Sequence, residues 1–125
     1  MSQVLADKIS DAELEVMKLL WRADDALPIQ VIRTTLQKTS NWEATTIKTM
    51  VNRLLQKGVI RQEKRDVFYY SPLVSEEEYN KWATKNLIWK LFDGSAVNFI
   101  ASLVRTEELT RNDIEELRTI FKMKE

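Results

Sequence analysis

Apolar residues recur every three or four positions along most of the chain, the spacing that places them on one face of an α-helix. The clearest stripe runs through residues 43–57 and consists of Ile47, Met50, Val51, Leu54 and Leu55. Gly58 follows at once, at the position where a helix commonly ends in a left-handed glycine. The pattern predicts an amphipathic helix over Glu43–Lys57 whose apolar face packs against a core.

Two shorter helices are predicted before this one. Their apolar stripes cover about Asp11–Arg22 and the segment from Ile29 to about Lys38. Residues 24–27 are expected to form a turn, and Pro28 is expected at the first helical position, where its missing N–H is tolerated. A polar turn at residues 39–41 then leads into the helix over residues 43–57.

After Gly58 the period of the pattern changes. Residues 59–63 and 67–71 are rich in β-branched and aromatic side chains, and a polar triplet, Lys64 to Asp66, separates them. Pro72 ends the second of these segments, because proline cannot donate a hydrogen bond to a sheet. A β-hairpin is therefore predicted.

The rest of the chain is predicted to be helical, over about Ser75–Phe92, Ala96–Arg105 and Thr110–Met123. Helix starts carry capping signals, in which a hydroxyl residue precedes an acidic residue by three positions: Ser10 and Glu13, Ser75 and Glu78, Thr110 and Asp113. The expected fold class is mainly α with a small β-hairpin. A winged helix-turn-helix domain (residues 1–74) is followed by a three-helix dimerisation domain (residues 75–125).

Composition removes most of the chemistry that a small enzyme uses. The 125 residues contain no cysteine and no histidine, which excludes disulfides, thiolate or imidazole metal sites and histidine-activated nucleophiles. With two glycines, neither a Walker-type phosphate loop nor a dinucleotide-binding glycine motif can be formed. No catalytic residue, metal or cofactor is expected. No apolar stretch has the length or flanks of a membrane span or a signal peptide, so we expect a cytoplasmic protein without membrane insertion.

The order of two short helices, a polar turn and a hairpin is typical of a helix-turn-helix with a β wing. An α-helix fits the major groove of DNA, and a basic hairpin tip can reach a phosphate or the minor groove. In projection, the helix over residues 43–57 carries a polar side without carboxylates opposite its apolar stripe. The residues expected to bind double-stranded DNA are Thr45, Thr46, Lys48, Thr49, Asn52, Arg53 and Gln56, together with Lys64 and Arg65 of the hairpin.

Charge is distributed in the same sense. The chain as a whole is neutral, with nineteen basic and nineteen acidic residues. Residues 33–65, however, hold eight basic and two acidic side chains, a net charge of +6, whereas residues 75–125 hold eight basic and ten acidic ones, a net charge of −2. A polyphosphate partner would be attracted to the middle of the chain and not to its C-terminal part.

Other interpretations fit some of these features. Any amphipathic helix has a solvated polar side, and Lys64 and Arg65 fit a soluble hairpin tip as well as a phosphate contact. The neutral total charge also favours an alternative function, a winged-helix module that binds protein without reading DNA. The two functions differ in salt dependence, because only DNA binding releases condensed counterions.

The last three predicted helices carry more apolar side chains than solvated helices need, and a second copy of the chain would cover them best. A two-fold dimer would also present two reading helices to a palindromic operator, with half-sites roughly 34–36 Å apart or a multiple of that distance. The predicted homodimer interface consists of Leu87, Ile88, Leu91, Val97, Ile100, Leu103, Val104, Ile114, Leu117, Ile120 and Phe121.

Several segments together resemble the penicillinase repressor family over about residues 9–122. They are ISDAELEVM (9–17), NWEATTIKT (41–49), NRLLQKG (52–58), EEL (107–109) and IEELR (114–118). The resemblance implies a dimeric winged-helix repressor that occupies a palindromic operator and shuts off resistance or metal-homeostasis genes. It also implies that Thr45, Thr46, Lys48, Thr49 and Arg53 face DNA, in agreement with the projection.

The chain differs from parts of this family in ways that concern the inducer. The copper-responsive branch ends in Cys-x-Cys motifs, and this chain has no cysteine, so metal-triggered release by that chemistry is not expected. In the antibiotic-resistance branch, a membrane sensor-peptidase pathway leads to cleavage of an Asn-Phe bond in the dimerisation region. Aligned on residues 107–109, that bond falls at Ser102–Leu103, and a literal Asn98–Phe99 lies one helical turn earlier. Both bonds are candidates for cleavage.

Overall fold

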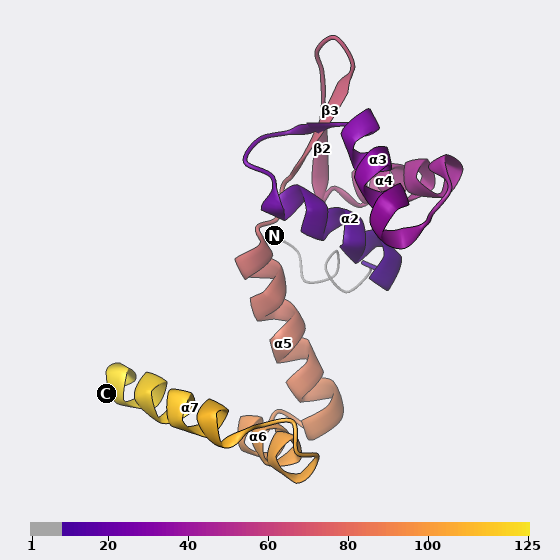
Figure 1. The fold of residues 1–125 in the computed structure, drawn as a ribbon. Helices are drawn as coiled ribbons and strands as arrows, with labels where there is room; N and C mark the ends of the chain where they lie inside the picture. Colours follow the sequence, from indigo (N-terminus) through magenta and orange to yellow (C-terminus); the bar gives the residue numbers. More distant parts are fainter. Residues whose placement is uncertain (1–8) are drawn as a thin grey trace. The chain divides into compact units, whose positions relative to one another are not determined.

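The computed structural model describes residues 9–125, which form six helices and three short strands (Figure 1). In chain order these are α2 (Asp11–Arg22), β1 (Leu27–Pro28), α3 (Ile29–Ser40), α4 (Ala44–Lys57), β2 (Ile60–Lys64), β3 (Phe68–Pro72), α5 (Glu76–Phe92), α6 (Ala96–Arg105) and α7 (Arg111–Lys124). The chain divides into two compact units, Met1–Ala83 and Thr84–Glu125, and the division lies inside α5. The domain boundary predicted at residues 74 and 75 lies just before that helix.

The predicted helix starts are present as hydrogen-bonded caps. Ser10 Oγ accepts from the N–H of Glu13 and the Glu13 carboxylate accepts from the N–H of Ser10, and Thr110 and Asp113 form the same reciprocal pair. At the start of α5, Ser75 Oγ accepts from the N–H of Glu78 at 3.0 Å. Such caps satisfy backbone donors that the first turn of a helix leaves unpaired.

The sheet has three strands, not the predicted two, in the order β1-β3-β2. β1 pairs antiparallel with β3, with Leu27 opposite Tyr70 and Pro28 opposite Tyr69. The prediction of a turn over residues 24–27 is therefore wrong at Leu27. Pro28 is also not the first helical residue: its backbone is extended and precedes the helix, because the same residue belongs to an edge strand.

The hairpin of β2 and β3 is present, with each strand displaced by one residue from the prediction. Gln62 lies opposite Tyr70, Glu63 opposite Tyr69 and Lys64 opposite Phe68. α3 extends two residues beyond its predicted end, to Ser40. The hairpin, called the wing below, projects beyond the helices of the first unit (Figure 1).

The core of the first unit draws on every element from α2 to β3. Its α4 contribution is Ile47, Met50, Val51 and Leu54, four of the five residues of the predicted stripe, and Leu55 is partly buried against them. From α2 come Val16, Met17 and Leu20, and from α3 come Ile32 and Leu36. The buried stripe fixes which side of α4 is left to solvent.

An ion pair at the edge of this core joins α2 to α4. Glu13, which is 1% exposed, accepts a hydrogen bond from Lys57 Nζ at 2.5 Å, so the start of α2 is tied to the last turn of α4. Trp21 Nε1 donates to the carbonyl of Val74 at 2.8 Å, and its ring packs against Tyr79. These contacts connect α2 to both the end of α4 and the start of α5.

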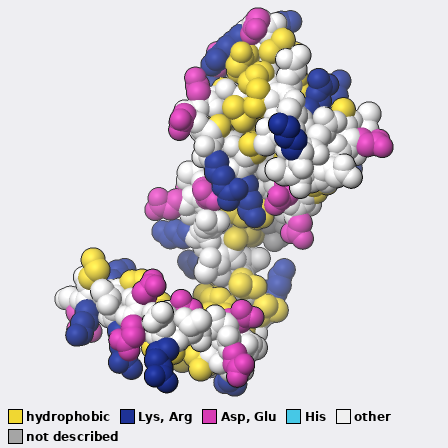
Figure 2. Space-filling model, in the orientation of Figure 1, with side chains coloured by type: hydrophobic (Ala, Val, Ile, Leu, Met, Phe, Trp, Pro, Cys, Tyr) yellow, Lys and Arg dark blue, Asp and Glu magenta, His cyan; other side chains and the backbone are white. Residues whose placement is uncertain are grey.

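The second unit contains no fully buried side chain among the described residues of its helices. Phe92 and Phe99 pack against each other with ring centroids 5.5 Å apart, and Trp89 lies over Gly94. Other large apolar side chains remain on its surface (Figure 2), with Val97 76% and Leu91 62% exposed.

The described residues include no single helix with the length and apolar composition of a membrane span. Only α5 and α6 taken together, with a sharp bend between them, reach that length and composition.

Candidate nucleic-acid interface

The polar side of α4 lies on the surface of the first unit. All seven residues predicted on it are exposed: Thr45, Thr46, Lys48, Thr49, Asn52, Arg53 and Gln56. None of them is acidic, and Lys57 in the last turn is occupied by Glu13. The surface carries hydrogen-bond donors, methyl groups and positive charge, all of which a phosphate-rich partner can contact. It has no carboxylate that would repel such a partner.

The hydroxyl of one threonine on this surface, Thr49, is already engaged in a hydrogen bond within the helix. Thr49 Oγ1 donates a hydrogen bond to the backbone carbonyl of Thr45 at 2.9 Å. Its hydroxyl hydrogen is therefore engaged within the helix, a common arrangement for helical threonine. What Thr49 presents outward is a methyl group and an oxygen acceptor, which suits contact with a thymine methyl.

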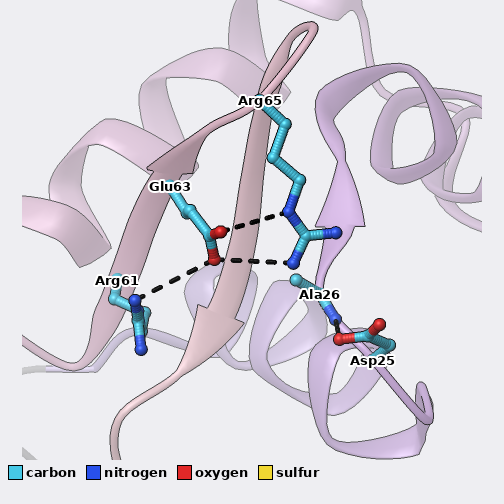
Figure 3. Close-up of polar contacts among 5 residues, drawn as sticks. All are labelled: Asp25, Ala26, Arg61, Glu63 and Arg65. Carbon is cyan, nitrogen blue, oxygen red and sulfur yellow. Dashed lines mark hydrogen bonds and ion pairs between the residues drawn. The ribbon is translucent and has the colours of Figure 1, made fainter.

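The two predicted wing cations lie on opposite faces of the hairpin. Arg65 Nε and Nη2 donate to the carboxylate of Glu63 at 3.2 and 3.4 Å (Figure 3). Its guanidinium also lies 4.5 Å from the centre of the Tyr69 ring. Arg61 Nη2 approaches the same carboxylate at 3.9 Å. Hydrogen bonding to Glu63 raises the pKa of Arg65, and its charge is partly neutralised within the wing.

Lys64 points to the other face, because side chains alternate along a strand. Its Nζ lies 5.3 Å from the centre of the Phe68 ring, which is directly opposite it in the register. Lys64 and Phe68 both line a cleft of about 330 Å³ between the wing and the helices. The structure thus brings Lys64 toward α4 and turns Arg65 toward Glu63.

The cleft joins residues from three elements. Arg33 of α3, Lys48 and Asn52 of α4, and Lys64 of β2 line it, together with Asp66 of the hairpin tip and apolar side chains that include Phe68 and Tyr70. Lys48, Asn52 and Lys64 were predicted as DNA contacts, whereas Arg33 was counted only in the charge balance. The position of Arg33 depends on tertiary packing, and the local pattern of the sequence carries no signal for it.

A second hollow, of about 570 Å³, has the opposite character. Its polar lining includes Asp24, Asp25, Glu76 and Glu78, and no basic side chain from residues 9–125 lines it. It lies between the end of α2, the end of β3 and the start of α5. A polyanion is therefore favoured at the cleft beside α4 and disfavoured at this hollow.

The C-terminal residues predicted to form the dimer interface lie largely at the surface of this single chain. Eight of the eleven are exposed and Ile88, Leu103 and Leu117 are partly buried. The candidate cleavage residues all lie within α6: Asn98 is exposed, and Phe99, Ser102 and Leu103 are partly buried.

Comparison with known proteins identifies the family. The sequence profile described as "Penicillinase repressor" matches residues 9–123. The penicillinase repressor of Bacillus licheniformis is 34% identical over 115 residues, which cover 91% of this chain and 89% of that protein. The methicillin resistance regulatory protein MecI of Staphylococcus aureus (strain N315) is 35% identical over 118 residues, 94% of this chain and 95% of that protein.

Solved structures confirm the predicted fold class. The solution structure of the DNA-binding domain of the repressor BlaI matches with a TM-score of 0.53 and 42% identity, covering 58% of this chain and 88% of that one. The solution structure of the Bacillus licheniformis BlaI monomeric form in complex with the blaP half-operator matches at 0.52, with the same identity and coverage. With the winged fold, the exposed α4 surface and these relatives taken together, the chain belongs to the penicillinase repressor family, a family of transcriptional repressors and not of enzymes.

Proposed function

We propose that this chain is a dimeric, sequence-specific repressor that acts in the cytoplasm by occupying a palindromic operator and blocking a promoter. The observation that carries the proposal is the exposed side of α4, which is free of carboxylates and flanked by the cationic cleft. A relative was solved with its monomeric form bound to a half-operator, which supports one half-site for each subunit. The relatives' names favour a target gene for antibiotic resistance, of the β-lactamase type.

Dimerisation through the second unit is part of the proposal. Helices α6 and α7 contribute no buried residue, and apart from Met123 the exposed large apolar side chains on them lie at the predicted interface positions. Water-exposed apolar surface of this extent is typical of an interaction site. A second copy of the same unit is the partner that also supplies the two-fold symmetry of a palindrome.

Induction is proposed to occur by cleavage within α6, downstream of a membrane sensor-peptidase pathway. A peptidase needs an extended substrate, so either candidate bond requires local opening of the helix. Asn98–Phe99 lies in the first turn, where Ser95 Oγ caps the N–H of Asn98, and Ser102–Leu103 lies further in. The first turn of a helix opens more easily, which favours Asn98–Phe99. Mass spectrometry of the fragments from induced cells distinguishes the two bonds, and a full-length repressor after β-lactam challenge would exclude both.

The direct test of the proposed function is binding to the promoter region of the neighbouring genes. We expect the binding constant to fall with about the −0.9Z power of salt concentration for Z phosphate contacts, and a strong preference over a scrambled duplex. A β-lactamase or sensor-peptidase gene beside the repressor gene would identify the regulated system. Binding to no duplex at low salt would exclude a DNA-reading role and leave the protein-interaction module.

Arg53 provides the corresponding test of base reading. It is exposed on the polar side of α4, where an arginine can contact guanine in a bidentate manner. Arg53→Ala is expected to weaken binding by about 1–3 kcal/mol and to relax the preference at one base pair. An equal loss on every sequence would assign Arg53 to a phosphate instead.

A further inference from the structure

The cleft between the wing and the helices gathers positive charge from three separate elements. Arg33 comes from α3, Lys48 from α4 and Lys64 from β2, and all three line the same space. Asp66 at the hairpin tip is the acidic residue among the lining side chains. Three positive charges against one negative charge give the lining a net charge of +2, which favours an anionic ligand in the cleft.

None of these three cations forms a salt bridge within residues 9–125. The wing arginines on the other face differ, because Arg61 and Arg65 both share Glu63. Glu63 thus pairs with the wing arginines Arg61 and Arg65. The cations of the cleft are left available to a ligand. Arg33 is moreover only partly exposed, which increases the strength of its interaction with an anion compared with a fully solvated arginine.

We infer that this cleft seats one phosphodiester of the operator backbone and that Arg33 is a phosphate contact. The inference rests on the proposed function and adds a residue and a binding site to it. If α4 enters the major groove and the wing reaches across to the neighbouring groove, the DNA strand between them passes over the space that separates α4 from the wing. That space is the cleft. Its cations are complementary in charge to the phosphate. Its apolar walls, including Phe68, can pack against the adjacent deoxyribose.

The first experiment compares Arg33→Ala with Arg22→Ala, which removes an exposed arginine at the end of α2, outside the cleft. Anisotropy titrations on the operator and on a scrambled duplex are run over a range of salt concentrations. Arg33→Ala should weaken both complexes roughly tenfold and make the slope of log binding constant against log salt shallower by about 0.9. Arg22→Ala should change neither quantity.

Arg33→Lys keeps the charge and tests whether a loss reflects folding instead of contact. This variant should retain the salt slope while binding more weakly, because lysine lacks the planar fork of arginine. Unfolding curves of each variant, measured without DNA, are expected to overlay the wild-type curve. A shallower slope in Arg33→Lys would overturn the assignment.

The second experiment locates the phosphate. Single methylphosphonates, which remove one backbone charge at a time, are placed along each half-site of the operator. One position should weaken the wild-type protein but leave Arg33→Ala unaffected, since the partner of that phosphate is already missing. Additive losses at every position would overturn the inference.

The remaining outcomes separate this inference from its alternatives. If the wild type binds the operator and Arg33→Ala behaves identically, the inference fails and the proposed function stands. If the wild type binds no duplex, the proposed function itself fails. Calorimetric titration with inorganic phosphate tests a free anion: saturable binding that depends on Arg33 but leaves the affinity for the operator unchanged would assign the cleft to a small anion and overturn the DNA contact.

Discussion

Glu13 holds two structural roles in one side chain. Its carboxylate accepts the N–H of Ser10 in the capping box of α2 and also pairs with Lys57 at the end of α4. Burial by itself raises the pKa of Glu13, but the hydrogen bonds from Lys57 and Ser10 outweigh it, so the pKa lies below its usual value. The ionised form is therefore the one that stabilises the fold.

Glu13→Gln is expected to reduce the free energy of unfolding at neutral pH by about 1.5–3 kcal/mol, since glutamine retains the cap but not the ion pair. A lowered folded-state pKa stabilises the protein above the unfolded pKa, and this contribution disappears as the pH falls through the folded pKa. The variant should therefore lose less stability than the wild type when acidified. Urea denaturation from neutral to acid pH at fixed protein concentration measures this difference.

Glu15→Gln is the matched control, because Glu15 is exposed on the same helix and pairs with Lys18 at the surface. Its effect should stay within about 0.5 kcal/mol at every pH. Parallel pH profiles for wild type and Glu13→Gln would contradict the assigned role of the buried pair.

At the scale of elements, Glu63 lowers the positive charge of the wing, because its carboxylate pairs with two arginines. Glu63→Gln removes the carboxylate that Arg61 and Arg65 share and removes a negative charge from the proposed DNA-binding surface. We expect binding to any duplex to tighten by roughly threefold to tenfold at low salt, with a steeper salt dependence.

Glu77→Gln supplies the comparison for this prediction, because it makes the same change in net charge at an exposed position of the α5 first turn. Anisotropy titrations on operator and scrambled duplexes should show no such gain for it. Equal gains in both variants would indicate that total charge, and not the wing, controls binding.

The two glycines that end α4 and α5 permit a second element-scale prediction. Both have a left-handed backbone, with φ of +75° at Gly58 and +87° at Gly94. A Cβ at Gly58 would meet nothing within 4 Å, whereas one at Gly94 would lie 2.8–2.9 Å from the Trp89 ring. Gly58→Ala should lose about 1–2 kcal/mol from strain alone, and Gly94→Ala should lose more and shift the tryptophan fluorescence. Equal losses with unchanged fluorescence would show that Trp89 does not pack on Gly94 in solution.

The features that could be predicted from the sequence are those with a regular hydrophobic period. The stripe of α4 extends from Ile47 to Leu55, about two and a half turns, so both its buried face and its exposed polar side could be projected correctly. β1 has two residues and no period, and its existence depends on Tyr69 and Tyr70, which lie far along the chain. For the same reason the pairing of Glu13 with Lys57, the docking of Arg65 on Glu63 and the position of Arg33 required the tertiary structure.

At the scale of the whole molecule, the two units differ in how far they bury their apolar side chains. The first encloses a core that includes Val16, Ile32 and Ile47, all fully buried, and the second encloses none. The boundary predicted at residues 74 and 75 lies just before α5, whereas the two compact units divide within that helix. The second unit is thus the part whose folding is expected to depend on a partner.

Val97→Glu tests this dependence. Val97 lies in the first turn of α6, where an acidic residue is compatible with the helix dipole, so a lone chain should tolerate it. If a second copy covers Val97, a buried unpaired charge should shift the dimer toward monomer at a given concentration. Sedimentation over a dilution series measures the shift. Asn98→Glu, the same charge on the polar side of the turn, should leave assembly unchanged. An undisturbed dimer in Val97→Glu would exclude Val97 from the interface.

The missing core of the second unit has a consequence for gene control. If the helices of that unit become ordered only when two chains meet, the population of paired chains follows the square of abundance when the repressor is scarce. Halving its synthesis would then cut operator-competent molecules by up to about fourfold. Promoter output would respond as a threshold and not in proportion, so a modest rate of degradation in the cell would be enough to switch the regulated gene on.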